Sequence, residues 1–273
     1  MTTENPVAAA QQRTPWIFFA MACGISWLIW IPTGEWLPKS IQTPFLLLGG
    51  FGPFAAAMLL IRLTEGKAAL FDWLKTTFNL RIRWIWYAMG ALFLPLGMAL
   101  IHHGLHLGLG GTSGFAFTTE MFIYPIPLIM TALLGGGNEE PGWRAYATPK
   151  LLQVFHPIVA SAIVGIFWVV WHLPLYVFGN WSGMDQPLLW FFLYAVALSI
   201  VMTWLYLRSG RGIIPVMLLH GATNVIFLYF PREGTLFGDM STDFNILKTM
   251  AYWTVALIIL FATKGRLGLE KES

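Results

Sequence analysis

Long uncharged stretches of apolar residues recur along the chain, separated by short segments that carry most of its charges. They cover residues 16–32, 44–61, 84–107, 122–147, 157–178, 188–207, 213–230 and 247–262. A helix that crosses a bilayer needs about 20 mostly apolar residues, so the pattern predicts eight membrane-spanning helices. In the fourth stretch three glycines at 135–137, followed by polar residues, interrupt the apolar run. We therefore predict that the fourth helix is broken.

The composition agrees with a chain whose surroundings are largely lipid. Of the 273 residues 57% are hydrophobic and only 11% are charged, and the mean hydropathy is +0.66. A soluble domain usually carries about 25% charged residues. The low charge excludes a soluble enzyme, a disordered chain and a nucleic-acid-binding protein, despite a pI near 9.0. No linker or repeat divides the chain, so we expect one integral membrane domain over residues 1–273.

The positions of the basic residues predict the orientation of the helices. Lys and Arg favour the cytoplasmic side of a membrane. With eight spans and the N-terminus inside, thirteen Lys and Arg residues lie on the inner side, and Lys39, Arg232 and Lys248 lie on the outer side. Both termini are therefore expected in the cytoplasm. Residues 65–83 mix bases with Leu, Phe and Trp, which predicts an amphipathic helix at the membrane surface.

A group of charges stands out at the break in the fourth stretch. Glu140 and Arg144 have the i, i+4 spacing of a helical ion pair, which leaves Glu139 as the unpaired carboxylate. A carboxylate in a site of low dielectric can serve as a general base. Pro141 and Gly142 indicate irregular backbone, which membranes tolerate only inside protein or beside a watery cavity. The alternative is that these charges are solvated in a cytoplasmic loop.

Polar residues in two later spans complete a candidate site. His172 lies deep in the fifth stretch, and His220 and Asn224 lie one helical turn apart in the seventh. Each histidine alone is more often a satisfied core residue. Together with Glu139 they form a set that could activate water, with Glu139 and His172 polarising it and His220 and Asn224 donating to an oxyanion. We expect the four to line one water-accessible cavity that opens toward the cytoplasmic half.

Three segments resemble the motifs of the CAAX-protease and bacteriocin-processing family (CPBP, or Abi), intramembrane peptidases that include the Ras-converting CAAX endopeptidase. Residues 139–144, EEPGWR, resemble the first motif, Glu-Glu-x-x-x-Arg. His172 matches the second motif, Phe-x-x-x-His, with Trp168 at the phenylalanine position. His220 and Asn224 match the third, His-x-x-x-Asn. The resemblance extends over about residues 131–229, and we place the catalytic core at residues 118–230.

This resemblance implies an eight-helix endopeptidase that cleaves near the C-terminus of membrane-tethered protein or peptide substrates. Carried over by position, the resemblance implies that Glu139 is the general base and that His172 helps it to polarise the water. It also implies that His220 and Asn224 donate hydrogen bonds to the oxyanion. Glu140 and Arg144 would hold the broken helix in shape. The bacterial character of this variant suggests a prokaryotic plasma membrane, where prenylated substrates are not expected. The native substrate is therefore open.

The role of a metal is also open at this point. The family has been described both as metalloproteases and as metal-independent glutamic peptidases. From ligand chemistry alone, Glu139, His172 and His220 could hold zinc with one position left for water. The sequence HExxH is absent, which excludes a zincin-type helix. We favour direct activation of water by the glutamate.

Other functions remain as alternatives. A broken helix with buried charges also occurs at the binding sites of membrane transporters, although no inverted repeat is visible here. A non-catalytic immunity or scaffold protein of the same fold would carry the same helices. Ser113 lies in a G-x-S-G sequence, which we interpret as a flexible outer loop, and His102, His103 and His106 have the spacing of a surface metal site.

Overall fold

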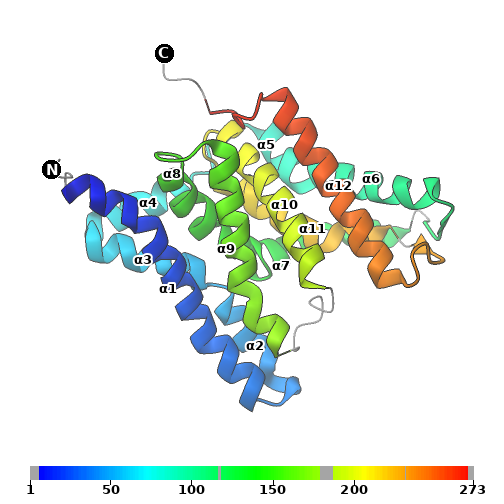
Figure 1. Ribbon diagram of the computed structural model, residues 1–273, viewed down its shortest axis with the longest axis horizontal. Coiled ribbons are helices and arrows are strands. Elements are labelled where there is room, and N and C mark those ends of the chain that lie inside the picture. Colours follow the sequence, from blue (N-terminus) through cyan, green and yellow to red (C-terminus); the bar gives the residue numbers. More distant parts are fainter. Residues whose placement is uncertain (1–5, 116–117, 179–186, 231, 270–273) are drawn as a thin grey trace.

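The computed structural model describes residues 6–115, 118–178, 187–230 and 232–269, most of which are helical (Figure 1). The first half contains α1 (Pro6–Trp36), α2 (Lys39–Gly49), α3 (Gly52–Thr64), α4 (Lys67–Thr77), α5 (Trp84–Ala88), the π-helical turn η1 (Met89–Phe93), α6 (Leu94–Gly108), β1 (Thr112–Ser113) and the 3₁₀ turn η2 (Thr119–Ile123). The second half contains α7 (Pro125–Leu134), the 3₁₀ turn η3 (Gly137–Glu139), the π-helical η4 (Pro141–Ala147), α8 (Thr148–Leu151), α9 (Pro157–Val177), α10 (Leu188–Arg208), α11 (Ile213–Val225), η5 (Ile226–Tyr229), β2 (Arg232–Glu233) and α12 (Met240–Ala262).

The predicted helical class is confirmed. Among the described residues, seven helical stretches are long and apolar enough to cross a membrane. The shorter apolar stretch Ile213–Tyr229 corresponds to the predicted seventh span. The side of the membrane on which each end lies stays a prediction. Residues 65–83 do contain a helix, α4, whose place at the membrane surface also stays a prediction.

Apolar residues cover the outside of the protein, and polar residues are gathered inside. Leu28, Phe122 and Phe261 are each more than three-quarters exposed. Glu140 and Arg144, in contrast, are completely buried. Such an outer surface is compatible with lipid and not with water, because soluble proteins rarely expose large contiguous apolar patches. The chain is an integral multi-pass membrane protein.

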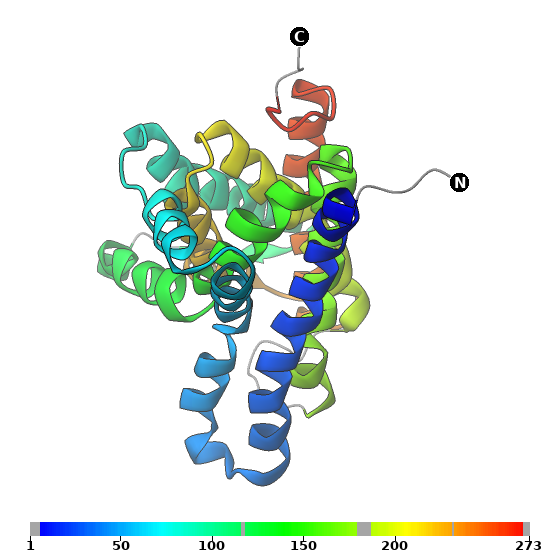
Figure 2. The same cartoon turned by 90° about the vertical axis from the view of Figure 1, so that its left-hand side faces the viewer.

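The second predicted span is split, which the hydropathy pattern did not show. α2 ends at Gly49 and α3 begins at Gly52. α1 runs beside α2 (Figure 2) and supplies donors for carbonyl groups near the break. Ser26 Oγ donates to the Gly49 carbonyl at 2.7 Å, and Trp30 Nε1 donates to the Leu46 carbonyl at 2.9 Å. Three glycines and Pro53 also lie within residues 49–53, a local signal that hydropathy alone does not use.

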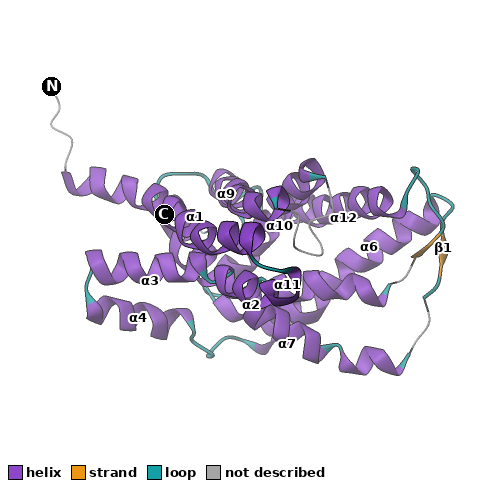
Figure 3. Ribbon diagram, turned by 90° about the horizontal axis from the view of Figure 1, so that it is seen from below, coloured by secondary structure: helices purple, strands orange, loops and turns teal. Residues whose placement is uncertain are grey.

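α7 packs against α11, and Figure 3 shows α7 along the lower edge of the protein in this view. Their backbones approach so closely that a Cβ on Gly221 would come within 2.6 Å of the Ala132 nitrogen. Thr131 Oγ1 donates to the Gly221 carbonyl at 3.0 Å. Glycine at position 221 is what leaves room for this close approach. The approach brings the end of α7 against the helix that carries His220.

A two-residue antiparallel ladder pairs β1 with β2 at one end of the protein (Figure 3). His106 is buried beneath it, with Nε2 3.1 Å from the carbonyl oxygens of Thr112 and Glu233. Ser113 thus belongs to a short paired strand, and the flexibility and outer position expected of this segment stay predictions. The backbone of this segment is held by pairing with a strand about 120 residues later, which a local pattern does not reveal.

Candidate active site

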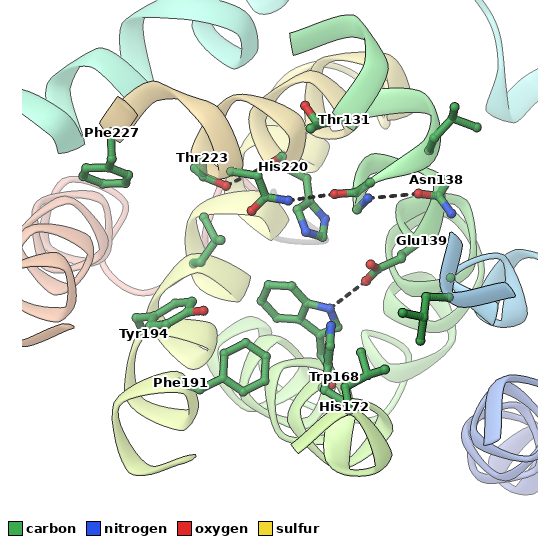
Figure 4. Close-up of a pocket in the computed structure, with 18 of the residues that line it drawn as sticks. Thr131, Asn138, Glu139, Trp168, His172, Phe191, Tyr194, His220, Thr223 and Phe227 are labelled. Carbon is green, nitrogen blue, oxygen red and sulfur yellow. Dashed lines mark hydrogen bonds between the residues drawn. The ribbon is translucent and has the colours of Figure 1, made fainter. Parts of the chain in front are cut away.

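The four predicted site residues line one cavity of about 740 Å³. Glu139 comes from η3, His172 from α9, and His220 and Asn224 from α11. Their convergence is shown for three of them in Figure 4. The prediction that they share a cavity is confirmed, whereas the direction in which it opens stays a prediction. Glu139 is 5% exposed, so its interpretation as a solvated loop charge is wrong.

The three-glycine segment ends α7 and presents Glu139 to the cavity. Gly136 has φ +135°, a conformation that L side chains rarely adopt. A Cβ on Gly137 would lie 2.3 Å from the Ala132 carbonyl oxygen and 2.6 Å from that of Met217. The Gly136 backbone N–H donates to Asn138 Oδ1 at 3.0 Å, which closes the turn. Glycine is therefore needed here for both backbone conformation and space.

Trp168 contacts three of the four candidate site residues. Its Nε1–H donates to Glu139 Oε2 at 2.7 Å (Figure 4). Its ring also makes edge contacts with His172 and His220, at centroid distances of 5.5 and 5.1 Å. The sequence comparison treated Trp168 only as an aromatic residue in place of phenylalanine. A phenylalanine could make the ring contacts but not the hydrogen bond.

A backbone hydrogen bond fixes the tautomer of His172. Its Nδ1 lies 2.7 Å from the Trp168 carbonyl oxygen, which can only accept, so Nδ1 carries the hydrogen. In the neutral ring Nε2 is then an acceptor. Trp171 and Phe191 pack edge-on against the ring at 4.6 and 5.0 Å. These contacts hold the imidazole so that Nε2 is the nitrogen available to water or substrate.

Glu140 lies behind His220 and is shared by two partners. Its Oε2 lies 3.1 Å from Arg144 Nη1, and its Oε1 lies 2.7 Å from His220 Nδ1. The expected pairing with Arg144 is confirmed, but the contact with His220 was not foreseen from the sequence. It depends on the packing of α11 against the π-helical segment that follows Glu140. The carboxylate orients the His220 ring and leaves Nε2 for the cavity.

Gly136 keeps the space in front of His220 and Asn224 open. A Cβ at this position would lie 2.7 Å from His220 Nε2 and 2.9 Å from Asn224 Nδ2. Asn224 Nδ2 donates one of its two hydrogens to the Gly135 carbonyl at 2.8 Å. The second hydrogen is left for another acceptor. Two nitrogen groups thus meet at one small space beside the glycine turn.

The suggested zinc ligands do not form a metal site. Glu139, His172 and His220 line the same cavity. Over the described ranges, however, no three His, Cys, Asp or Glu side chains are placed so that they could hold a metal ion. The histidines of α6 do not form one either. His103 Nε2 lies 2.8 Å from Ser113 Oγ, and this pair does not line the cavity.

Lys248 also lines the cavity, which the sequence interpretation did not foresee. We assigned it to the outer side of the membrane, at the edge of the eighth span. α12 begins at Met240, so Lys248 is more than two turns inside the helix, where it lines the cavity. The helix begins earlier than its apolar pattern because Asp239 caps it, accepting a hydrogen bond from the Thr242 backbone N–H at 2.8 Å.

Comparison with known proteins supports the family resemblance. Residues 122–226 match the family model described as type II CAAX prenyl endopeptidase Rce1-like. A protein named CAAX prenyl protease 2, from Methanococcus maripaludis, is 26% identical over 279 residues, covering 94% of this chain and 96% of that protein. The matched segment contains all three motifs. The resemblance that these motifs predicted is thus confirmed, and the chain is similar to a family of proteases.

Proposed function

We propose that this protein is an intramembrane endopeptidase that hydrolyses a peptide bond near the C-terminus of a membrane-tethered substrate. One observation carries the proposal: Glu139, His172, His220 and Asn224 line a single cavity. All four residues lie in the segment that matches the CAAX endopeptidase model. The site is a single catalytic unit built from residues 118–230 and closed by the neighbouring helices.

Water is activated on the Glu139 side of the cavity. The water donates one hydrogen to Glu139 and the other to Nε2 of His172, which the Trp168 carbonyl keeps as an acceptor. As the water oxygen attacks the substrate carbonyl carbon, its proton passes to Glu139. Glu139 then gives this proton to the leaving amine when the C–N bond breaks. Trp168 holds the carboxylate in position through both transfers.

The carbonyl oxygen becomes negative during the attack, and His220 with Asn224 stabilises it. Donation by His220 requires a hydrogen on Nε2, so the ring acts as an imidazolium whose Nδ1–H bonds Glu140. Asn224 adds its second Nδ2 hydrogen. Removing a single oxyanion donor typically costs about 10²–10³ in kcat. The open space at Gly136 is where this oxygen fits.

The walls of the cavity suit a substrate that is itself partly in lipid. Most of its lining is aromatic or aliphatic, including Trp30, Leu46, Leu175, Phe191 and Leu198. An apolar wall favours apolar residues or a covalently attached lipid through the hydrophobic effect. We therefore propose lipidated C-terminal peptides, such as CAAX-like sequences, as the first substrates to test.

Mass spectrometry of cleaved peptides tests the proposal. Detergent-purified protein is incubated with lipidated C-terminal peptides, with and without a chelator. Glu139→Gln keeps the shape of the side chain but removes the base, so cleavage should disappear. Glu35→Gln removes an exposed carboxylate that does not line the cavity and should leave cleavage unchanged.

The outcomes separate the competing functions. Cleavage that requires Glu139 and survives the chelator supports direct activation of water. Loss of cleavage with chelator supports a metal-dependent reaction. Cleavage that persists in Glu139→Gln refutes the proposed base. If the unmodified protein cleaves none of the peptides, the non-catalytic scaffold and the transporter become the better hypotheses.

A further inference from the structure

A lysine side chain lies at the cavity, away from the proposed base. Among the described residues that line the cavity, Lys248 is the one Lys or Arg and Glu139 is the one carboxylate. Lys248 Nζ lies 3.9 Å from the ring centroid of Tyr194. Figure 4 shows Tyr194 across the cavity from Glu139. The cavity therefore has a cationic end and an anionic end.

Aromatic rings surround the ammonium group. Besides Tyr194, the rings of Phe244, Tyr252 and Phe227 have centroids at 5.6, 5.6 and 5.9 Å from Lys248 Nζ. The rings also contact each other: the ring centroids of Tyr194 and Tyr252 are 5.7 Å apart. These contacts hold the rings in place around the ammonium group. Cation–π contacts favour a cation at this place. They offset only part of the cost of removing an ammonium group from water.

No anion of the protein completes the site. Within the ranges that the structure describes, Lys248 makes no ion pair and no hydrogen bond. A buried charge is normally paired, so an unpaired one beside a cavity indicates a charged ligand. The ligand expected from this charge is an anion.

A second polar group lies on the same face of α12. Asn245 precedes Lys248 by three residues, lines the cavity and is only 2% exposed. Residues three apart on a helix are neighbours. Its backbone carbonyl accepts from Thr249 Oγ1, and its side-chain amide has no hydrogen-bond partner among the described residues. A lysine ammonium beside an amide N–H₂ matches the two oxygens of a carboxylate.

We propose that Lys248 and Asn245 bind the free C-terminal carboxylate of the peptide substrate. This inference rests on the proposed function, which places the peptide in the same cavity. A peptide whose end is fixed at Lys248 extends toward Glu139 with its last residues across the cavity. The two charged ends would then determine both the direction of the bound peptide and the distance of the cut from its end.

Binding of two forms of one peptide tests the inference. The probe is a short fluorescent peptide with one S-farnesyl cysteine, made as a free acid and as a C-terminal amide. Fluorescence anisotropy gives Kd for the full-length Glu139→Gln protein in detergent, which leaves the peptide intact. We expect the acid to bind at least about tenfold more tightly than the amide, a difference of about 1.4 kcal/mol.

Variants identify the group that recognises the acid. Adding Lys248→Met should reduce the affinity for the acid to that for the amide and leave the affinity for the amide unchanged. Lys248→Arg should keep most of the preference, and Asn245→Leu should weaken it less than Lys248→Met does. Thermal unfolding of each variant shows that the protein is folded. Equal binding of acid and amide, a preference that survives Lys248→Met, or no binding of either peptide would overturn the inference.

Cleavage separates the two proposals. With Glu139 intact, both peptides are offered and the products are measured. Cleavage of both at the same rate, with equal binding, leaves the protease and removes the carboxylate site. A preference for binding the acid that depends on Lys248, without cleavage of either peptide, supports the carboxylate site and contradicts the protease.

Discussion

Replacing Glu140 with glutamine should destabilise the protein far more than the same replacement at Glu139. Glu140 is completely buried and lies 3.1 Å from Arg144 Nη1 and 2.7 Å from His220 Nδ1. It is the one ion-pair partner that Arg144 has among the described residues. Glu139 instead accepts a hydrogen bond from Trp168, which a glutamine oxygen can also accept.

The magnitude follows from the charge left behind. Removing one partner of a buried ion pair costs about 3–5 kcal/mol, because the other charge remains buried and unpaired. At about 2–4 °C per kcal/mol for chains of 150–250 residues, Glu140→Gln should lower Tm by about 10 °C. Glu139→Gln leaves no such charge and should change Tm by no more than about 2 °C, by the same conversion.

Thermal unfolding in detergent, followed beside peptide cleavage, measures both effects. A second change, Arg144→Met, removes the stranded charge, so the double variant with Glu140→Gln should regain most of the lost Tm. In the double variant His220 still lacks the carboxylate that orients it, and a hydrogen bond to a charged group is worth about 1.5–3 kcal/mol. The activity of the double variant should therefore stay about 10–100-fold below that of the unmodified protein. Equal Tm losses for Glu139→Gln and Glu140→Gln, or a double variant no more stable than Glu140→Gln alone, would refute the reasoning.

Three further predictions follow from the geometry. Gly136→Ala imposes a backbone strain of about 1–3 kcal/mol and displaces His220, so kcat/KM should fall about 100-fold or more. Gly97→Ala, which meets no atom within 4 Å, is the matched control, and equal activity of the two variants would contradict the description of the turn. Trp168→Phe should lower kcat about tenfold with little change in KM, as expected when a hydrogen bond that holds the base is lost; an unchanged kcat would show that the indole does not position Glu139. Protease digestion of tagged protein in sealed vesicles of known orientation should place both termini on the cytoplasmic side, and opposite sides for the two tags would refute the predicted orientation.

Hydropathy alone located the helical stretches, because a bilayer requires about 20 apolar residues per crossing wherever the chain comes from. It did not show the split between α2 and α3, because glycine and proline at residues 49–53 mark the split and hydropathy ignores their backbone preferences. It also did not show that Lys248 lines the cavity. The apolar run begins beside Lys248, whereas α12 begins earlier, at Met240.

The sequence identified four residues that line one cavity, but it did not show most of the contacts around them. Spacing along one helix correctly paired Glu140 with Arg144. The contact between Glu140 and His220 spans 80 residues and arises only from helix packing. The hydrogen bond from Trp168 to Glu139 also joins two separate segments. The sequence could not show it, because the acceptor of an indole N–H is known only once the helices are packed.

The shortness of α7 has a consequence for how rates are measured. Its ten residues extend about 15 Å, half of the bilayer's hydrocarbon thickness of about 30 Å. It exposes Ile126, Ile129 and Leu133, and its Thr131 and Leu134 line the cavity. Under the proposed function, a substrate dissolved in the membrane would pass this short helix to reach the cavity and would arrive by two-dimensional diffusion. Encounter then depends on the number of substrate molecules per lipid or detergent molecule, and an apparent KM in bulk molarity should rise in proportion to added detergent.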